Sequence, residues 1–112
     1  MRYEITEMLD TRTGLIWMRQ VKAELTFSEA HAYAKRLAKQ TGRDWRLPTI
    51  SELQTISDMP EIATLETFWS SDPVEGRPEY RWCLWHCPRE GTYFHAGLAY
   101  YGQYAVRLVR SN

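Results

Sequence analysis

Two cysteines and two histidines lie close together in the last third of the chain, where thiol, redox or metal chemistry would be most readily built. Cys83 and Cys87 are separated by three residues, with His86 between them and His95 further on. Zinc sites usually combine a close pair of cysteines with a second pair of ligands further along the chain. Here His95 alone would serve as the distal ligand, so the spacing completes only the first half of such a site.

A disulfide between the two cysteines is also disfavoured by their spacing. Residues four apart on one extended strand lie about 13 Å apart, beyond the reach of an S–S bond, unless the chain turns at His86. Neither cysteine shows a paired base and an orienting acid in the sequence, as nucleophilic catalysis requires. We therefore expect Cys83 and Cys87 to be buried or half-buried thiols, with no cofactor and no enzymatic activity. A metal or redox enzyme remains the alternative interpretation.

The run from Trp45 to Pro48 is a second candidate, because an arginine can bind a carboxylate or a phosphate through two parallel hydrogen bonds. A structural role is favoured, since motifs this short often occur without a function. Trp45 and Leu47 can enter the core from an extended segment, while Arg46 binds backbone carbonyls or an acid such as Glu52. The residues predicted to have such structural roles are Trp17, Trp45, Arg46, Pro48, Glu52, Trp69, Arg107 and Arg110.

Aromatic residues interleaved with arginines form the third candidate. Tyr, Trp and Arg dominate the hot spots of protein interfaces, and flat rings also stack on sugars. Side chains alternate between the two faces of a strand, so Trp82 should lie on one face and Arg81 and Trp85 on the other. Gly102 permits a tight turn that should expose a neighbouring tyrosine. The predicted binding residues are Arg77, Arg81, Trp85, Arg89, Tyr93, Tyr100, Tyr101 and Tyr104, and Trp82 and Phe94 complete the aromatic set.

Two helices are predicted in the first half of the chain. Thr26 and Glu29 have the spacing of a capping box, apolar residues then recur every three or four positions, and Gly42 ends the pattern. Thr49 and Glu52 repeat the capping-box spacing and start a shorter helix that ends before Pro60.

Strands are predicted at both ends of the chain. A hairpin or a pair of short strands is expected from residues 1–6 and 15–18. Aromatic and branched residues predict later strands at 67–71, 80–85, 92–98 and 105–110. Residues 73–78, 88–91 and 97–102 contain the Gly and Pro of the turns between them. Helices first and strands afterwards indicate one α+β domain over residues 1–112.

Five short blocks occur in the order in which a known bacterial family has them: Asp10-x-x-Thr13-Gly14-Leu15-x-Trp17, Phe27-x-Glu29-Ala30 with Ala34, Trp45-Arg46-Leu47-Pro48-Thr49-x-x-Glu52-Leu53, Phe68-Trp69-Ser70-Ser71 and Val106-Arg107-Leu108-Val109-Arg110. In these blocks the chain resembles the Lcl C-terminal domain family, which has a C-type-lectin-like fold and is related to sulfatase-modifying-factor domains. The resemblance implies that two helices flank a small antiparallel sheet and that the first and last strands pair. It also implies an irregular region between Ser71 and Tyr104 that forms the ligand-binding surface.

The relatives of this family also suggest activities, which the residues here do not favour. Formylglycine-generating enzymes use a cysteine pair with copper, but their cysteine spacing differs and they are much larger. Sugar-binding lectins often use calcium, and no dense run of oxygen ligands is present here. Adhesin relatives bind sulfated polysaccharide, a role for which a leader and an excess of basic residues would be expected.

Charge and hydropathy narrow the classes of partner. Among 112 residues, 14 acids balance 14 bases, so nucleic acid and anionic membranes are poor candidates. No apolar run reaches the length of a signal peptide or a membrane span, and we expect a cytoplasmic protein. The favoured function is a non-catalytic module that binds a protein partner, as a small bacterial or phage inhibitor or immunity-like protein would. The alternatives are glycan binding and, second, the metal or redox enzyme.

Overall fold

The computed structural model describes residues 6–57, 66–87, 91–99 and 101–112. It confirms an α+β fold, with two helices and two sheets in this part of the chain. In chain order the elements are β1 (Glu7–Asp10), β2 (Leu15–Met18), β3 (Lys22–Leu25), α1 (Phe27–Thr41), α2 (Ile50–Ile56), β4 (Thr67–Val74), β5 (Arg77–Cys87), β6 (Gly91–Leu98), β7 (Tyr104–Val106) and β8 (Val109–Ser111).

Both helices begin at the predicted capping boxes. The Thr26 hydroxyl accepts a hydrogen bond from the Glu29 amide, and the Glu29 carboxylate accepts one from the Thr26 amide. Gly42 ends α1 in the left-handed conformation that glycine adopts without strain, at φ 69°. Thr49 and Glu52 repeat the reciprocal bonds in α2. The described part of α2 ends at Ile56, and Pro60, the expected stop, lies outside the described residues.

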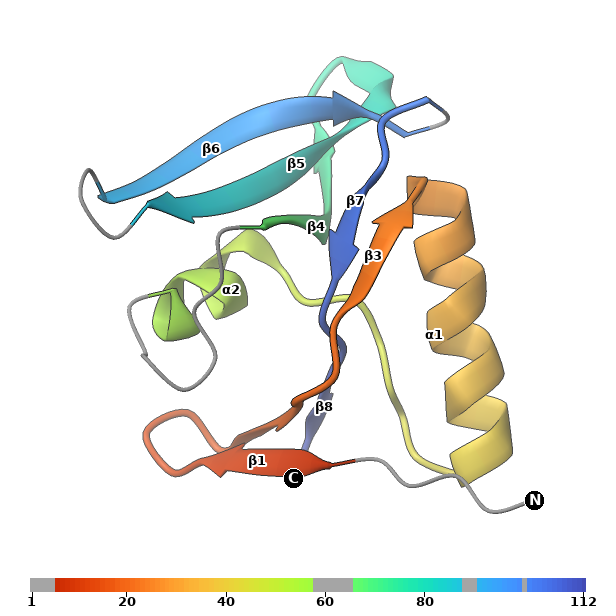
Figure 1. The fold of residues 1–112 in the computed structure, drawn as a ribbon, viewed down its shortest axis with the longest axis vertical. Helices are drawn as coiled ribbons and strands as arrows, with labels where there is room; N and C mark the ends of the chain where they lie inside the picture. Colours follow the sequence, from red (N-terminus) through yellow and green to blue (C-terminus); the bar gives the residue numbers. More distant parts are fainter. Residues whose placement is uncertain (1–5, 58–65, 88–90, 100) are drawn as a thin grey trace.

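A three-stranded antiparallel sheet in the order β1-β2-β8 lies at the bottom of the molecule (Figure 1). The expectation that the first and last strands pair is therefore wrong. The last strand, β8, pairs with β2, and β1 lies on the other side of β2. The predicted strand at 105–110 is also divided, since Arg107 and Leu108 separate β7 from β8. Residues 1–5, where the first strand was predicted, lie outside the described residues.

The second sheet has five strands in the order β3-β7-β4-β5-β6, so β6 is an edge strand. Its pairs are antiparallel except for β4 and β7, which are parallel. The prediction of an irregular region between Ser71 and Tyr104 is wrong, because the described part of this segment forms the second half of β4 and the long β5–β6 hairpin. The turn predicted at 73–78 is confined to Glu75 and Gly76, with Gly76 at φ 73°.

The two faces of this sheet support separate cores, with α1 on one side and α2 on the other (Figure 1). Trp69 and Cys83 belong to the core that includes α1, whereas their chain neighbours Phe68 and Leu84 belong to the core that includes α2. This division follows from the alternation of side chains along β4 and β5. The core residues from α1 are Ala30, Ala34 and Leu37, and those from α2 are Leu53 and Ile56.

Candidate functional site

Residues 45–48 lie in the loop between α1 and α2, and this loop forms hydrogen bonds with the last strand, β8. Trp45, Leu47 and Pro48 are buried. The backbone of Arg46 donates to Val109 and accepts from it, both at 3.0 Å, and the Pro48 carbonyl accepts from the Ser71 amide at 2.8 Å. These backbone bonds tie the loop to β8 and to β4.

The Arg46 side chain forms the ion pair with Glu52 that the spacing suggested. Its Nη1 and Nη2 atoms donate to the two carboxylate oxygens, each at 2.7 Å. The hydrogen bonds from Arg46 hold the pKa of Glu52 below its ordinary value, and partial burial opposes this effect. Since the Arg46 side chain remains 42% exposed, solvent screens the pair, and its contribution to stability is about 0.5–1 kcal/mol.

Arg107 and Arg110 are also held by groups of the fold. Arg107 is buried where β7 gives way to β8, and its Nη1 donates to the carbonyls of Met18 and Arg19 at 3.1 and 2.8 Å. Burial lowers the pKa of Arg107, while the charge of Glu66 raises it. Arg110 pairs with Glu7, with its Nη2 3.0 Å from a carboxylate oxygen. We call the three-stranded sheet together with residues 45–48 and 107–108 the base; its arginines stabilise the fold.

The residues proposed for metal or thiol chemistry lie on β5 and β6. Cys83 is a buried free thiol whose Sγ lies 3.8 Å from the Arg81 carbonyl. Cys87 lies four residues further along the same strand, and His95 lies opposite Cys83 on β6. In the described parts of the chain, no three His, Cys, Asp or Glu side chains gather closely enough to hold a metal ion. Burial raises the pKa of Cys83 to about 12, so this thiol is protonated and unreactive near neutral pH.

The predicted aromatic set divides between the two faces of the β5–β6 hairpin. Trp85 and Tyr93 lie opposite one another and stack, with ring centroids 5.4 Å apart. Trp82 and Phe94 lie towards α2, where they line a cleft of about 320 Å³ together with Asp72. Exposure is 36% for Trp82 and 43% each for Tyr93 and Phe94, so the hairpin presents aromatic rings on both of its faces.

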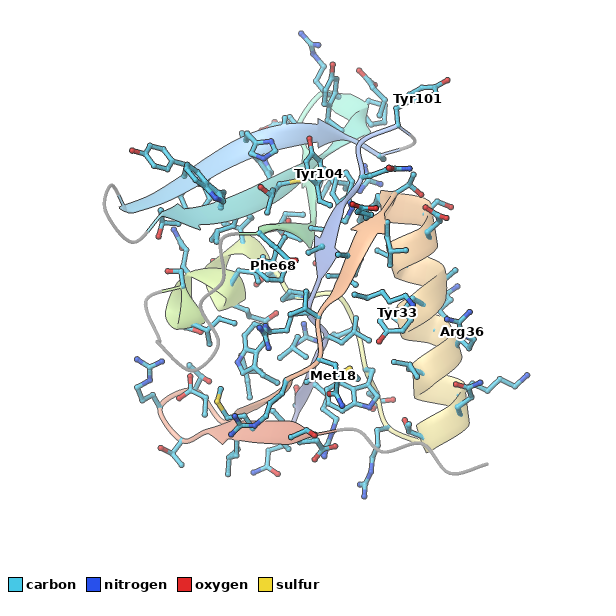
Figure 2. The ribbon with its side chains drawn as sticks, in the orientation of Figure 1. Met18, Tyr33, Arg36, Phe68, Tyr101 and Tyr104 are labelled. Atoms are coloured by element: carbon cyan, nitrogen blue, oxygen red, sulfur yellow. The ribbon has the colours of Figure 1, made fainter. Side chains whose placement is uncertain are left out.

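Tyr101 and Tyr104 have different surroundings although they are close in the sequence. Tyr101 is 82% exposed and projects from the segment before β7 (Figure 2). Tyr104 is half-buried in β7, with its ring centroid 4.9 Å from that of Trp69 and 5.3 Å from that of His95. A Cβ atom at Gly97 would lie 2.7 Å from the Tyr104 ring, so the close packing of this ring requires glycine on β6. Tyr104 therefore belongs to the core side of the sheet more than to an open binding surface.

The predicted arginines likewise occupy different positions. Arg77 is exposed at the start of β5, whereas Arg81 is half-buried and lies with its guanidinium carbon 4.8 Å from the centre of the Phe27 ring. Arg89 and Tyr100 lie outside the described residues.

A groove of about 700 Å³ was not predicted from the sequence, although two of its residues, Arg46 and Arg81, were named for other reasons. It lies between the start of α1, the loop before α2 and the start of β5, and Phe27 and His31 also line it. Its lining comes from segments far apart along the chain, so no local spacing could have shown that these side chains meet.

Taken together, the structure defines a small α+β domain whose two sheets share the C-terminal segment through β7 and β8, with exposed rings on the β5–β6 hairpin. The chain belongs to the Lcl C-terminal domain family, which it matches over residues 6–110. The match covers the described elements from β1 to β7 completely and most of β8. No curated protein and no solved structure matches the chain.

The helices give no sign of a membrane span. In the described residues, neither α1 nor α2 is long and apolar enough to cross a membrane.

Proposed function

We propose that this domain is a non-catalytic binding module that recognises a protein partner through the β5–β6 hairpin. The observation that carries the proposal is the exposure of three large rings on this one hairpin, those of Trp82, Tyr93 and Phe94. Exposed aromatic residues of this kind supply most of the binding energy in protein interfaces.

The edge of the sheet supports the same proposal. β6 is the outermost strand of the five-stranded sheet, and its sequence from Gly91 to Leu98 contains no Lys, Arg, Asp, Glu or Pro. Proteins usually protect such edges with charges, prolines or bulges, because an open edge pairs readily with another strand. An extended segment of a partner that adds to β6 would place its own side chains beside Tyr93 and Phe94.

We further propose that the fold is C-type-lectin-like, as the resemblance implies. The pairing of β2 with β8, which joins segments near the two ends of the chain, and the two helices support this interpretation. A binding role on a variable upper surface fits such a fold, and here that surface is the hairpin with Tyr101. A setting inside a bacterial cell, as an inhibitor or immunity-like protein, belongs to the same proposal.

The proposal is tested by capturing partners from the native host with the wild-type domain and with single variants. We expect Tyr93→Ala, Phe94→Ala and Tyr101→Ala to reduce capture of a specific protein, because each removes an exposed ring. The matched control is Leu9→Ala, which removes an apolar side chain of similar exposure to Tyr93 and Phe94 (49%) from β1 in the other sheet. If the hairpin variants and Tyr101→Ala capture the partner as well as the control does, the surface is assigned wrongly.

Glycan binding is a second candidate, favoured by the stacked rings of Trp85 and Tyr93. Tyr93 exposes part of its ring, and sugars bind to flat aromatic surfaces of this kind. A glycan array with and without calcium separates the two functions. Binding to a defined glycan that is lost in Tyr93→Ala would favour this candidate, whereas no binding to any glycan would contradict it.

A further inference from the structure

The groove between α1 and β5 has an uncompensated positive charge. Arg46 and Arg81 both line it, and none of the described residues that line it is an aspartate or a glutamate. Arg46 is paired with Glu52, as described above. Arg81 donates instead to the carbonyls of Pro78 and Tyr80, at 2.8 and 2.9 Å, and has no carboxylate partner in the described part of the chain. Carbonyls do not neutralise a guanidinium, so one positive charge faces the groove.

Arg81 is also held in a fixed orientation. Both of its described hydrogen bonds come from Nη1, and its guanidinium lies over the Phe27 ring. That ring is itself fixed by an edge contact with Trp69, with centroids 5.7 Å apart. The Nε–Nη2 edge of Arg81, which makes none of the described hydrogen bonds, has the geometry that binds a carboxylate through two parallel bonds.

The rest of the lining combines hydroxyl groups with an apolar surface. Ser28 and Ser71 are exposed and supply hydroxyls, while Leu47 and Pro78 supply apolar surface next to Phe27. Ser28 lies in the first turn of α1. Volumes of 300–1,000 Å³ are typical of small-molecule sites, and about 700 Å³ lies within that range.

We propose that this groove binds a small organic carboxylate that carries an apolar or aromatic group. The carboxylate binds the free edge of Arg81, and the apolar part packs against Phe27, Leu47 and Pro78. A single negative charge matches the single uncompensated guanidinium. The site goes beyond the protein-binding role of the hairpin, because α1 and the loop before α2 provide most of its lining and the exposed rings of Tyr93 and Phe94 do not take part.

Phenylacetate is a suitable probe, and its neutral analogue 2-phenylethanol is the matched control. Titration of the ¹⁵N-labelled domain followed by NMR should shift the amide signals of Ser28, His31 and Ala99, which line the groove. Because 2-phenylethanol carries no negative charge, it should bind about tenfold or more weakly than phenylacetate, as expected when hydrogen bonds to a charged group are lost. Acetate and inorganic sulfate, which lack the apolar part, should also bind more weakly.

Several results of this titration would overturn the proposal. Absence of shifts in the groove with phenylacetate contradicts a carboxylate site. Equal affinity for phenylacetate and 2-phenylethanol contradicts the role of the charge. Sulfate that binds as tightly as phenylacetate contradicts the role of the apolar surface. These readouts use the wild-type protein and do not depend on the folding of any variant.

Variants then test the assignment to Arg81. Arg81→Met should weaken phenylacetate binding by about tenfold, and Arg81→Lys should restore only part of the loss because lysine lacks the planar fork. Arg77→Met, which removes an exposed arginine of the same strand from outside the groove, should leave the affinity unchanged. Tyr93→Ala should also leave it unchanged, which separates this site from the hairpin surface. If Arg81→Met folds and binds phenylacetate like the wild type, the assignment is wrong.

Discussion

At the base Trp17 and Trp45 are almost completely buried, whereas Trp82 and Tyr93 on the β5–β6 hairpin present much of their rings to solvent. The arginines differ in the same way. Arg107 at the base is held inside the fold by backbone carbonyls, while Arg77 at the start of the hairpin is exposed. The comparison shows that Trp, Tyr and Arg do not by themselves mark a binding site. What distinguishes the two regions is how completely the fold buries these side chains.

Removal of a ring should produce the largest difference between the two regions. We expect Trp17→Ala to lower the free energy of unfolding by about 3–5 kcal/mol, because it opens a cavity in a closed core. Trp82→Ala removes a ring that keeps 36% of its surface in solvent, so its cost should be smaller, about 1–2 kcal/mol. Urea unfolding followed by circular dichroism measures both changes. Similar losses for the two variants would contradict the division into a packed base and an available hairpin.

Removal of an arginine should have the next largest effect. Arg107→Met leaves the carbonyls of Met18 and Arg19 without their buried charged donor, which should cost about 2–3 kcal/mol. Arg77→Met changes an exposed side chain and should alter stability by about 0.5 kcal/mol or less. Thermal unfolding compares the two variants at the same pH. A stable Arg107→Met variant would show that this arginine is not needed to join β7 and β8 to β2.

The smallest effect is expected at the Arg46–Glu52 ion pair, and it should depend on pH. Arg46 lowers the pKa of Glu52 in the folded protein, so the ionised carboxylate stabilises the fold above its unfolded pKa, near 4.3. This contribution is lost as the pH falls through the folded-state pKa. Glu52→Gln should therefore cost about 0.5–1 kcal/mol at pH 7, and the difference from wild type should shrink as the pH is lowered from about 5 to about 3.

Glu29→Gln is the matched control for this measurement. Glu29 has the same capping position in α1 and bonds to the Thr26 amide, but its described contacts include no arginine. The stability of this variant should follow that of the wild type more closely across the acid range. A pH dependence equal to that of Glu52→Gln would mean that the cap, and not the ion pair, is responsible.

The features that the sequence predicts well are local. The capping boxes at Thr26 and Thr49 and the glycine cap at Gly42 involve neighbours within a few residues, so their spacing is sufficient to place both helices. The pair formed by Arg46 and Glu52 is local in the same sense, because it joins the loop to the first turn of α2.

The features that the sequence does not predict depend on contacts between distant segments. β3 was missed because Lys22–Leu25 consists of residues that favour helices and becomes a strand only by pairing with β7. Pro73 suggested a turn, yet it lies in β4 where the register with β5 shifts, a position at which a sheet tolerates proline. The groove around Arg81 was not predicted for the same reason, since its lining is assembled only in the folded chain.

The passage of the chain from β7 to β8 has a consequence for synthesis on the ribosome. β7 fills the gap between β3 and β4, and β8 completes the sheet that begins with β1 and β2. As long as residues 104–111 of a nascent chain remain inside the ribosome, neither sheet is complete, even if both helices have formed. Stable structure should therefore arise late and in one step, after translation has passed Ser111 and the ribosomal tunnel has cleared.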